Sequence, residues 1–571
     1  MWPTDKLSAR IRFSSELGFV LGVTLLWLAL YNLRFWQSAA AAMWHPSLSS
    51  VLFMGSLFLL ALLAQALLLL LLPRVLLRPV ACALFLAAAL IAYFSDTFGV
   101  FMDKDMLRNV FATDSAEVAG LINGRLLTYF LLLGVLPCVL ILRAQVPPLG
   151  WKQRLKQRSV FLGGLLVLCL VCLFAQSAAY ASFFREHKPV RLLLNPASAV
   201  YNLVELGIKE TSRREPATLA ELGGPVIRVA ALQPKPLMLF LVIGETARAG
   251  NFQLGGYDRP TNPQLASLAD LLYFKNTTSC GTATETSLPC IFSPLGRSEF
   301  DVDAAKHQTN LLDMLASAGL DVEWRDNNSG CKGVCARVRT QQFTSKENVP
   351  ACHGPYCYDE EMTVGLADRL RAVKRDCVIV FHQVGSHGPA YWQRYPPQFE
   401  KFKPACHSTQ LDRCSREAVI NAYDNTILYT DHNLAQQIQL LQQASDKIDS
   451  LLIYVSDHGE SLGENGVYLH GMPYALAPDN QKEVPFMVWM SAGYRQRTGI
   501  DEACLRARTA DAFTHDNVFH SVMGAVGVRN AAYKSALDIF SGCAKQTAFA
   551  ATTPAEEGPM AGDSRMLPAL D

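Results

Sequence analysis

The sequence predicts a membrane anchor of five helices followed by an α/β domain with a mainly parallel sheet. Half of the 571 residues are hydrophobic. Long apolar segments occur only before residue 181, and short apolar strands alternate with helical stretches after residue 236. The net charge of +1 shows no basic footprint for nucleic acid, so we expect no nucleic-acid partner.

Each of the five apolar segments approaches or reaches the roughly 20 residues that cross a bilayer. They are Leu17–Leu33, Leu48–Leu72, Pro79–Ser95, Leu126–Leu142 and Val160–Tyr180. Buried core helices are the alternative, but uncharged runs are rarely clustered so closely. We therefore assign residues 1–180 to a transmembrane anchor.

Basic residues predict the orientation of this anchor. They precede the first span, separate the second from the third, and separate the fourth from the fifth, whereas the loops 34–47 and 96–125 carry them at a lower density. Because basic loops stay in the cytoplasm, five spans that start inside leave the chain after Tyr180 outside. We expect an interfacial bridge and linker over residues 181–236.

The external loop 96–125 contains three polar residues that recur every four positions, Asn109, Thr113 and Glu117. On a helix these residues would share one polar face. A solvated surface stripe has the same spacing, so both interpretations stay open at this point. At the other end of the chain, residues 546–571 are rich in Ala, Pro and Glu, and we predict a disordered tail.

The use of cysteine differs between the apolar N-terminal part of the chain and the part that follows it. Four of the 15 cysteines lie in the apolar segments, and the other eleven follow residue 279. Ten of these form pairs: Cys280 and Cys290, Cys331 and Cys335, Cys352 and Cys357, Cys406 and Cys414, and Cys504 and Cys543. This usage indicates disulfides in an oxidising compartment. Clustered zinc–cysteine sites usually have another layout, and Cys377 is expected to be a buried free thiol.

Three predicted strands after residue 236 each end at potential ligands or acid/base groups. Leu237–Ile243 precedes Glu245, Cys377–Phe381 precedes His387, and Leu451–Val455 precedes Asp457 and His458. The carboxyl ends of parallel strands meet at one edge of a sheet, so these side chains can converge. Asp457 and His458 can bind one ion only if the chain turns after them, and Gly459 permits a turn. Helix caps and structural histidines are the alternative for each residue alone.

A hydroxyl-rich loop between Cys280 and Cys290 contains Thr284, which the pattern places near a helix N-terminus. A threonine hydroxyl needs a metal or a base to ionise near neutral pH. Glu245, Asp457 and His458 form a ligand set that suits zinc, with the Thr284 oxygen as fourth ligand. The alternative for the loop alone is a solvated turn.

Further polar residues extend this candidate site. His387 and His470 are candidates for proton transfer or for a second metal, since imidazole titrates close to neutral pH. Lys332 lies near Asn328 and Ser329 in a cysteine-clamped loop and could hold a phosphate oxygen. Together the residues predict metal-dependent phosphoryl or sulfuryl transfer.

These motifs resemble the phosphoethanolamine transferases of Gram-negative envelopes, which include the lipid A phosphoethanolamine transferases and the mobile colistin-resistance enzymes. The resemblance runs from the anchor to about Cys543. It rests on Gly244-Glu245-Thr246-Ala247-Arg248, Gly256-Tyr257 with Thr261-Asn262-Pro263, the loop Cys280–Cys290, Gly385-Ser386-His387-Gly388-Pro389 and Ser456-Asp457-His458-Gly459-Glu460. The cysteine-bracketed loop is the most specific of these motifs.

The resemblance implies an alkaline-phosphatase/sulfatase-like periplasmic domain over residues 237–545, on a multi-pass anchor in the bacterial inner membrane. It implies Zn2+ held by Glu245, Thr284, Asp457 and His458, and Thr284 as the nucleophile. It also places Lys332, His387 and His470 at the donor phosphate, and Asn109, Thr113 and Glu117 near the ethanolamine donor. Asn328 and Ser329 are expected to contact substrate as well.

The implied reaction transfers phosphoethanolamine from phosphatidylethanolamine to a phosphate of lipid A through a covalent phosphoethanolamine-threonine intermediate. Such a product would lower sensitivity to polymyxins and cationic peptides. We expect the enzyme to act as a monomer in the bilayer. Two residues depart from the family pattern: Gly255 stands where relatives commonly have asparagine, and Glu285 adds a negative charge beside the nucleophile.

Other functions stay open on the sequence. The same chemistry could serve another envelope acceptor, such as a core sugar phosphate or a periplasmic glucan, or could transfer phosphoglycerol. A sulfatase is disfavoured because the loop lacks a Cys/Ser-x-Pro-x-Arg motif. A non-catalytic envelope protein with a disulfide-stapled binding domain is the alternative from a different class.

Overall fold

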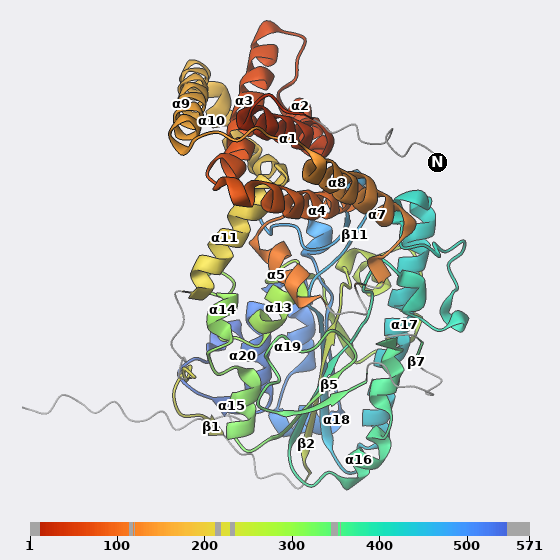
Figure 1. Cartoon of the computed structure of the whole chain (residues 1–571). Coiled ribbons are helices and arrows are strands. Elements are labelled where there is room, and N and C mark those ends of the chain that lie inside the picture. The colour runs from red at the N-terminus through yellow and green to blue at the C-terminus, as the bar shows by residue number, and fades with distance from the viewer. Residues whose placement is uncertain are drawn as a thin grey trace, which may run out of the picture.

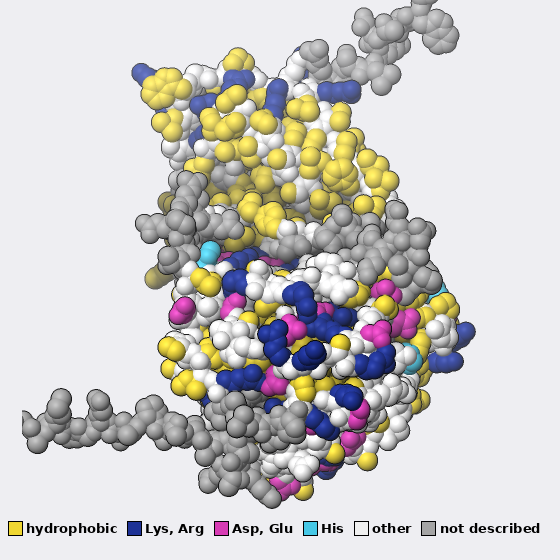
Figure 2. Space-filling model, turned by 90° about the horizontal axis from the view of Figure 1, so that it is seen from below, with side chains coloured by type: hydrophobic (Ala, Val, Ile, Leu, Met, Phe, Trp, Pro, Cys, Tyr) yellow, Lys and Arg dark blue, Asp and Glu magenta, His cyan; other side chains and the backbone are white. Residues whose placement is uncertain are grey.

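The computed structural model describes residues 12–113, 118, 120–211, 219–228, 235–343, 352–353 and 356–544. The chain forms a helical part, which contains the N-terminal helices, and an α/β part built around one sheet (Figure 1). Hydrophobic side chains gather on the surface of the helical part, and charged side chains gather on the α/β part (Figure 2). Glu117 and the predicted tail 546–571 lie outside the described residues.

The helical part contains the predicted apolar segments with shifted bounds. Its helices are α1 (Glu16–Leu30), α2 (Leu33–Met43), α3 (Leu48–Leu70), α4 (Arg74–Phe98), α7 (Gly124–Tyr129), the π-helix η1 (Phe130–Val135), α8 (Leu136–Arg143), α9 (Trp151–Ala175) and α10 (Ser177–Glu186). Among the described residues, four helical segments are long and apolar enough to cross a membrane, and the bent pair α1–α2 makes a fifth only if it counts as one span. The sequence predicted five unbroken spans, but the first of them is bent in the structure.

The first predicted span, Leu17–Leu33, is broken because polar side chains replace helix hydrogen bonds at its end. The axes of α1 and α2 meet at 66°. At the break, the buried Asn32 amide donates to the Trp27 carbonyl at 2.8 Å and to the Asn195 carbonyl at 2.7 Å. Asn195 in turn donates to the Ala88 carbonyl of α4 at 2.8 Å, and Gln65 of α3 donates to Asn195 at 2.7 Å. These hydrogen bonds thus tie the chain after the last span into the anchor.

The last predicted span, Val160–Tyr180, is also displaced. α9 begins at Trp151 and ends at Ala175, and Tyr180 belongs to the separate helix α10. Next come the 3₁₀ helix η2 (Lys188–Leu193) and α11 (Ala197–Thr211), which lead toward the α/β part. These helices occupy the region that the sequence predicted as an interfacial bridge.

The α/β part contains a seven-stranded sheet that is mixed rather than wholly parallel. Its order is β3 (Leu271–Phe274), β13 (Phe486–Met490), β10 (Asp449–Ser456), β2 (Leu237–Gly244), β9 (Cys377–His382), β5 (Asp321–Asp326) and β6 (Arg339–Gln342). Strands β10, β2, β9, β5 and β6 are parallel, whereas β13 is antiparallel to both β10 and β3. The three predicted strands are therefore the adjacent central ones, β10, β2 and β9.

Short strand pairs lie outside this sheet. β1 (Ile227–Arg228) pairs with β15 (Val528–Arg529), β4 (Asn276–Thr278) with β14 (Ala512–Thr514), β7 (Cys352–His353) with β8 (Tyr356–Cys357), and β11 (Ser461–Leu462) with β12 (Tyr468–Leu469). These pairs close loops around the main sheet.

Helices cover both faces of the sheet, so the central strands are buried on both sides. One face packs against α13 (Thr284–Ile291), α15 (Leu311–Ser317), α18 (Ala492–Thr498), α19 (Glu502–Ala507) and α20 (Asp516–Ala525), and the other against α12 (Pro263–Ala266), α16 (Leu366–Ala372) and α17 (Arg416–Gln443) (Figure 1). In β2, Leu239 and Leu241 join the first core and Phe240 and Val242 the second. This alternation is the period of two expected for a strand.

A short helix from the predicted loop 96–125 connects the two parts. α5 (Lys104–Ala112) lies against α13 and α11 (Figure 1). Arg108 of α5 forms an ion pair at 2.7 Å with Asp303 of α14 (Val302–Ala305), and Lys104 forms one at 2.5 Å with Glu205 of α11. The expected polar face is shorter than predicted, because Thr113 caps the end of α5 in an extended conformation.

The five disulfides join the cysteines that lie close in sequence: Cys280–Cys290, Cys331–Cys335, Cys352–Cys357, Cys406–Cys414 and Cys504–Cys543. Cys377 is free and buried, as expected. All five bridges lie in the α/β part, in agreement with an oxidising compartment for that part.

A buried carboxyl group in the α/β part predicts a pH dependence of stability. Burial raises the pKa of Asp538 from 3.8 to about 6. Its stabilising contribution is therefore complete below pH 4 and is lost as pH rises through 6. We expect the stability of the wild type relative to Asp538→Asn to fall by about 3 kcal/mol between pH 4 and pH 7.

Denaturation of the full chain at several pH values, for the wild type and for Asp538→Asn, measures this difference. Asp368→Asn is the control, because the Asp368 side chain is 84% exposed. A wild-type stability that changes with pH in parallel with that of Asp538→Asn would contradict the assignment.

Candidate active site

The end of β2 places Glu245 at the centre of the site. Glu245 is fully buried, and Thr246 after it has a φ of 52°, so the chain turns sharply beyond the strand. Gly385, after β9, packs against this turn. A Cβ atom at Gly385 would lie 2.8 Å from the Glu245 carbonyl oxygen, and its φ is +47°. Only glycine lets the two strand ends approach so closely.

The end of β10 contributes Asp457 and His458, both fully buried. The two backbone N–H groups of Thr246 and His458 donate to Asp457 Oδ1 at 3.2 and 2.7 Å. Gly459 follows the bend at Asp457, its φ is not among the positive values, and a Cβ atom there would lie 2.0 Å from the Asn480 carbonyl oxygen. Glycine is needed at this position for close packing rather than for a left-handed turn.

The hydroxyl loop places Thr284 at the first residue of α13, as expected. The Cys280–Cys290 disulfide joins the start of the loop to the helix. His515 holds the loop to β10: its Nδ1 accepts from the Cys280 N–H at 3.0 Å, and its Nε2 lies 2.9 Å from the Ser456 carbonyl oxygen. The sequence analysis missed His515 because nothing in its spacing connects it with the loop.

The four predicted zinc ligands converge. Thr284 Oγ1 lies 3.2 and 3.1 Å from the Glu245 carboxylate oxygens and 3.3 Å from His458 Nε2. His458 Nε2 lies 3.4 Å from Glu245 Oε1 and 3.3 Å from Asp457 Oδ2. The ligand atoms of Glu245, Asp457 and His458 all lie within 4.8 Å of one another, so these residues could hold a metal ion.

The charges of this cluster also favour a cation. Asp457 Oδ2 is buried and accepts no hydrogen bond from the described residues. Burial and the nearby Glu245 carboxylate raise the pKa of Asp457 well above its ordinary value. Burial opposes ionisation of Glu245 too, but the surrounding histidines lower its pKa to about 2. Burial also lowers the pKa of His458 to about 3, so its ring is neutral and can bind a metal.

Asn328 contacts Glu245 rather than the cavity. Its amide nitrogen donates to Glu245 Oε2 at 2.7 Å and to the Gln383 carbonyl at 2.9 Å, and it lies 3.3 Å from His382 Nε2. Asp326 lies behind both residues, accepting from the Asn328 N–H at 2.8 Å and lying 3.4 Å from His382 Nδ1. This buried polar chain orients the Glu245 carboxylate, and it does not support the predicted role of Asn328 as a substrate contact.

His387 and His470 form a second group beside Glu245. The ligand atoms of these three residues also lie within 4.8 Å of one another. His470 Nδ1 lies 2.8 Å from Glu460 Oε2, and the Tyr391 hydroxyl donates to Glu460 Oε1 at 2.6 Å. Because Glu460 engages Nδ1, the other ring nitrogen is left for substrate or metal. The sequence analysis quoted Glu460 without assigning it this role.

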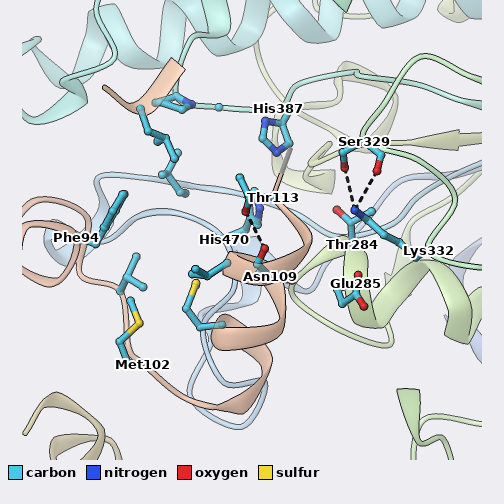
Figure 3. Close-up of a pocket in the computed structure, with 17 residues that line it drawn as sticks. Phe94, Met102, Asn109, Thr113, Thr284, Glu285, Ser329, Lys332, His387 and His470 are labelled. Atoms are coloured by element: carbon cyan, nitrogen blue, oxygen red, sulfur yellow. Dashed lines mark hydrogen bonds between the residues drawn. The ribbon is translucent and has the colours of Figure 1, made fainter. Parts of the chain in front are cut away.

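A cavity of about 150 Å³ connects these residues with the anchor. In Figure 3, Asn109, Thr113 and His470 lie together in the centre, with His387 above them and Thr284, Ser329 and Lys332 to the right. Lys332 donates to Ser329 Oγ at 3.0 Å. The anchor adds apolar side chains that the sequence analysis missed, Phe94, Val100, Met102 and Met106.

Comparison with known proteins agrees with this architecture. A sequence model of the family described as phosphoethanolamine transferase EptA/EptB matches residues 58–211, and one described as sulfatase matches residues 238–528. EptA of Salmonella typhimurium is 42% identical over 480 residues, which are 82% of this chain and 85% of that protein. The chain belongs to the phosphoethanolamine transferase family.

Other members of the phosphoethanolamine transferase family are also similar. Phosphatidylethanolamine transferase Mcr-2 of Escherichia coli is 42% identical over 514 residues, covering 88% of this chain and 94% of that one. The structure of the integral membrane protein lipooligosaccharide phosphoethanolamine transferase A from Neisseria meningitidis has a TM-score of 0.89 and 33% identity, covering 94% of this chain and 100% of that chain. The resemblance inferred from the motifs is confirmed, and the α/β part has the fold of the sulfatase family.

The polar chain behind Glu245 predicts a change in metal affinity. Asn328→Ala removes a donor from Glu245 Oε2 and leaves the carboxylate free to rotate, so we expect the affinity for a divalent metal to fall about 10- to 100-fold. Titration of the metal-free full chain with Zn2+ measures it. Asn276→Ala is the control, because Asn276 donates only to the distant Ala510 carbonyl. Equal zinc affinities in both variants would show that the buried polar residues behind Glu245 do not orient it.

Proposed function

We propose that the protein transfers phosphoethanolamine from phosphatidylethanolamine to a phosphate of lipid A, in the bacterial inner membrane with the α/β part in the periplasm. The single observation that carries this proposal is the composition of the cavity. Thr284 from the α/β part and Phe94, Val100 and Met102 from the anchor line the same space. A nucleophile beside membrane-borne apolar side chains suits a substrate that joins a phosphodiester to acyl chains. The names of the relatives support transfer of phosphoethanolamine.

Zinc is the cofactor that the ligand set fits. Glu245, Asp457 and His458 offer two oxygens and one nitrogen, the Thr284 oxygen lies beside them, and the unpartnered Asp457 Oδ2 lacks the positive partner that a cation would provide. When bound, zinc supplies positive charge that favours ionisation of a nearby hydroxyl and offsets the charge on a phosphoryl group. The remaining chemistry belongs to side chains of this protein.

In the first half of the reaction, Thr284 Oγ1 attacks the phosphorus of phosphatidylethanolamine. A bond forms between phosphorus and Thr284, and the bond to the diacylglycerol oxygen breaks. The Thr284 hydroxyl donates to the Glu245 oxygens at 3.1 to 3.2 Å, and its proton is released to water as the bond to phosphorus forms, because a carboxylate whose pKa is lowered to about 2 does not retain it. His387 or His470, which line the cavity, protonates the departing diacylglycerol oxygen.

In the second half, a phosphate oxygen of lipid A attacks the phosphoethanolamine on Thr284, and the threonine oxygen departs. Lys332 and the first turn of α13 lie where they would hold the non-bridging oxygens of the transferred phosphate. Asn109 and Thr113, from the anchor, face the same cavity and are proposed to contact the ethanolamine. Glu117, which lies outside the described residues, is proposed to join them.

Replacement of the nucleophile tests the proposal directly. We expect lipid A from cells expressing the wild type to carry a phosphoethanolamine adduct and lipid A from cells expressing Thr284→Ala to lack it. Mass spectrometry of lipid A measures both. Thr286→Ala, on the same helix but outside the cavity, is the control and should retain the product.

The outcomes separate the parts of the proposal. A modified lipid A in the Thr284→Ala strain would rule out Thr284 as the nucleophile. An unmodified lipid A together with phosphoethanolamine on Thr284 of the wild type would leave the first half intact and overturn the acceptor. Because the adduct adds a positive amine to lipid A, polymyxin susceptibility should fall only in strains that carry it.

Metal analysis tests the cofactor without relying on activity. We expect the purified wild type to contain zinc and His458→Ala to lose it, since one of three buried protein ligands is removed. Elemental analysis after dialysis measures the stoichiometry. His432→Ala is the control, because its hydrogen-bond and ring partners among the described residues are Gln264, Gln436, Phe399 and Tyr429, none of which belongs to the ligand set. Full zinc in a folded His458→Ala would place the metal elsewhere.

A further inference from the structure

A second cavity lies at the opposite end of the anchor from the active site. It has a volume of about 430 Å³, and Glu16, Arg74, Arg78 and Val146 are among its lining residues. Arg74 and Arg78 belong to the first turns of α4, whereas Phe94, near the end of α4, lines the catalytic cavity. At 1.5 Å per helical residue, roughly 36 Å separate the two ends of α4. The distance is close to a bilayer thickness.

The two arginines offer unused positive charge to this cavity. Arg74 donates through Nη2 to the Val146 carbonyl at 3.0 Å, and Arg78 donates through Nη2 to the Ala144 carbonyl at 2.6 Å. Neither forms an ion pair with a carboxylate among the described residues. A guanidinium group has five N–H donors, so both retain donors for an anion. They lie at the N-terminus of a 25-residue helix, whose dipole also favours an anion.

Glu16 contributes a carboxylate that needs a hydrogen-bond donor. Its side chain is almost fully buried, with a relative exposure of 2%. Oε1 accepts from Arg158 Nε at 3.1 Å and from Arg158 Nη2 at 2.5 Å. Oε2 is buried and has no hydrogen-bond partner among the described residues. An unsatisfied buried carboxylate oxygen is costly, so this atom indicates a missing donor.

Exposed apolar side chains lie close in sequence to the arginines of this cavity, and one of them, Val75, lines it. Leu71, at the end of α3, is 74% exposed, and Val75 and Leu76, which lie between the two arginines on α4, are 79% and 43% exposed. In an anchor, exposed apolar groups next to arginines are typical of the boundary between acyl chains and headgroups. A free anion would use the arginines alone, whereas a lipid would also cover these side chains.

We propose that this cavity binds the headgroup of a glycerophospholipid in the leaflet opposite the catalytic domain. The phosphodiester lies on Arg74 and Arg78, an N–H or O–H donor of the headgroup lies on Glu16 Oε2, and the acyl chains cover Val75 and Leu76. Phosphatidylethanolamine and phosphatidylglycerol both carry this chemistry, through an ammonium and through hydroxyls. Phosphatidylcholine has the phosphodiester and the positive charge but no donor. The lipid is a structural ligand and is not consumed.

Native mass spectrometry of the purified full chain tests the site. The protein is delipidated in detergent and mixed separately with phosphatidylethanolamine, phosphatidylglycerol and phosphatidylcholine. We expect the wild type to hold one lipid more than Arg74→Gln/Arg78→Gln, with a preference of roughly tenfold for the two donor-bearing lipids over phosphatidylcholine. Glu16→Gln should lose most of that preference for phosphatidylethanolamine. Arg143→Gln is the matched control, since Arg143 is exposed at the end of α8 and does not line the cavity.

Further measurements distinguish a bound lipid from a free anion and show whether a variant is still folded. Val146→Trp fills the cavity from the loop and leaves both arginines in place, so it should also lose one lipid while keeping the wild-type melting temperature. A folded Val146→Trp or double variant that retains the wild-type number of lipids would overturn the proposal. Binding of phosphatidylcholine as tight as that of the other two lipids would also overturn it. Thermal stabilisation by inorganic phosphate alone that equals stabilisation by lipid would have the same consequence. Lipid A modification is a separate readout, so failure of this site and failure of the proposed function are distinguishable.

Discussion

The crowding of ionisable groups at the ends of β2 and β10 is the constraint on which the site depends. Two carboxylates and a neutral imidazole share a buried space with a threonine hydroxyl, and one carboxylate oxygen has no partner among the described residues. Such an arrangement is unfavourable unless positive charge enters it. Much of the local structure holds these groups in place against that repulsion: backbone N–H donors on Asp457, the Asn328 amide on Glu245, and His515 between the hydroxyl loop and β10.

Contacts in the same region join the anchor and the α/β part around one cavity. α5 packs against α13, the helix that begins at Thr284, and Arg108 joins it to α14 by an ion pair. The catalytic cavity is therefore incomplete in either part alone. In the proposed reaction, substrates confined to the membrane would meet Thr284 in a cavity whose apolar wall belongs to the anchor, and this confinement would raise their effective concentration at the site.

Buried polar residues organise the anchor by the same rule that organises the active site. Asn32, Gln65 and Asn195 exchange hydrogen bonds where α1 breaks, and they connect the chain beyond the last span to α3 and α4. Hydropathy detects the apolar segments but not such a break, because two polar residues hardly alter the mean over a span. The first predicted span is bent for this reason, and a sheet read as mainly parallel contains the antiparallel strand β13.

The sequence by itself determined the two-part architecture, the disulfide pairs close in sequence, the family, and the residues that converge at the strand ends. These features follow from local pattern: apolar length, cysteine spacing, and ligands placed directly after strands. Tertiary structure decided what distant residues do to one another. It moved Asn328 from the cavity to Glu245, ended α5 before Thr113 could continue its polar face, and brought His515 and the anchor side chains to the site. Such contacts depend on how helices and strands pack, and sequence spacing carries no record of that packing.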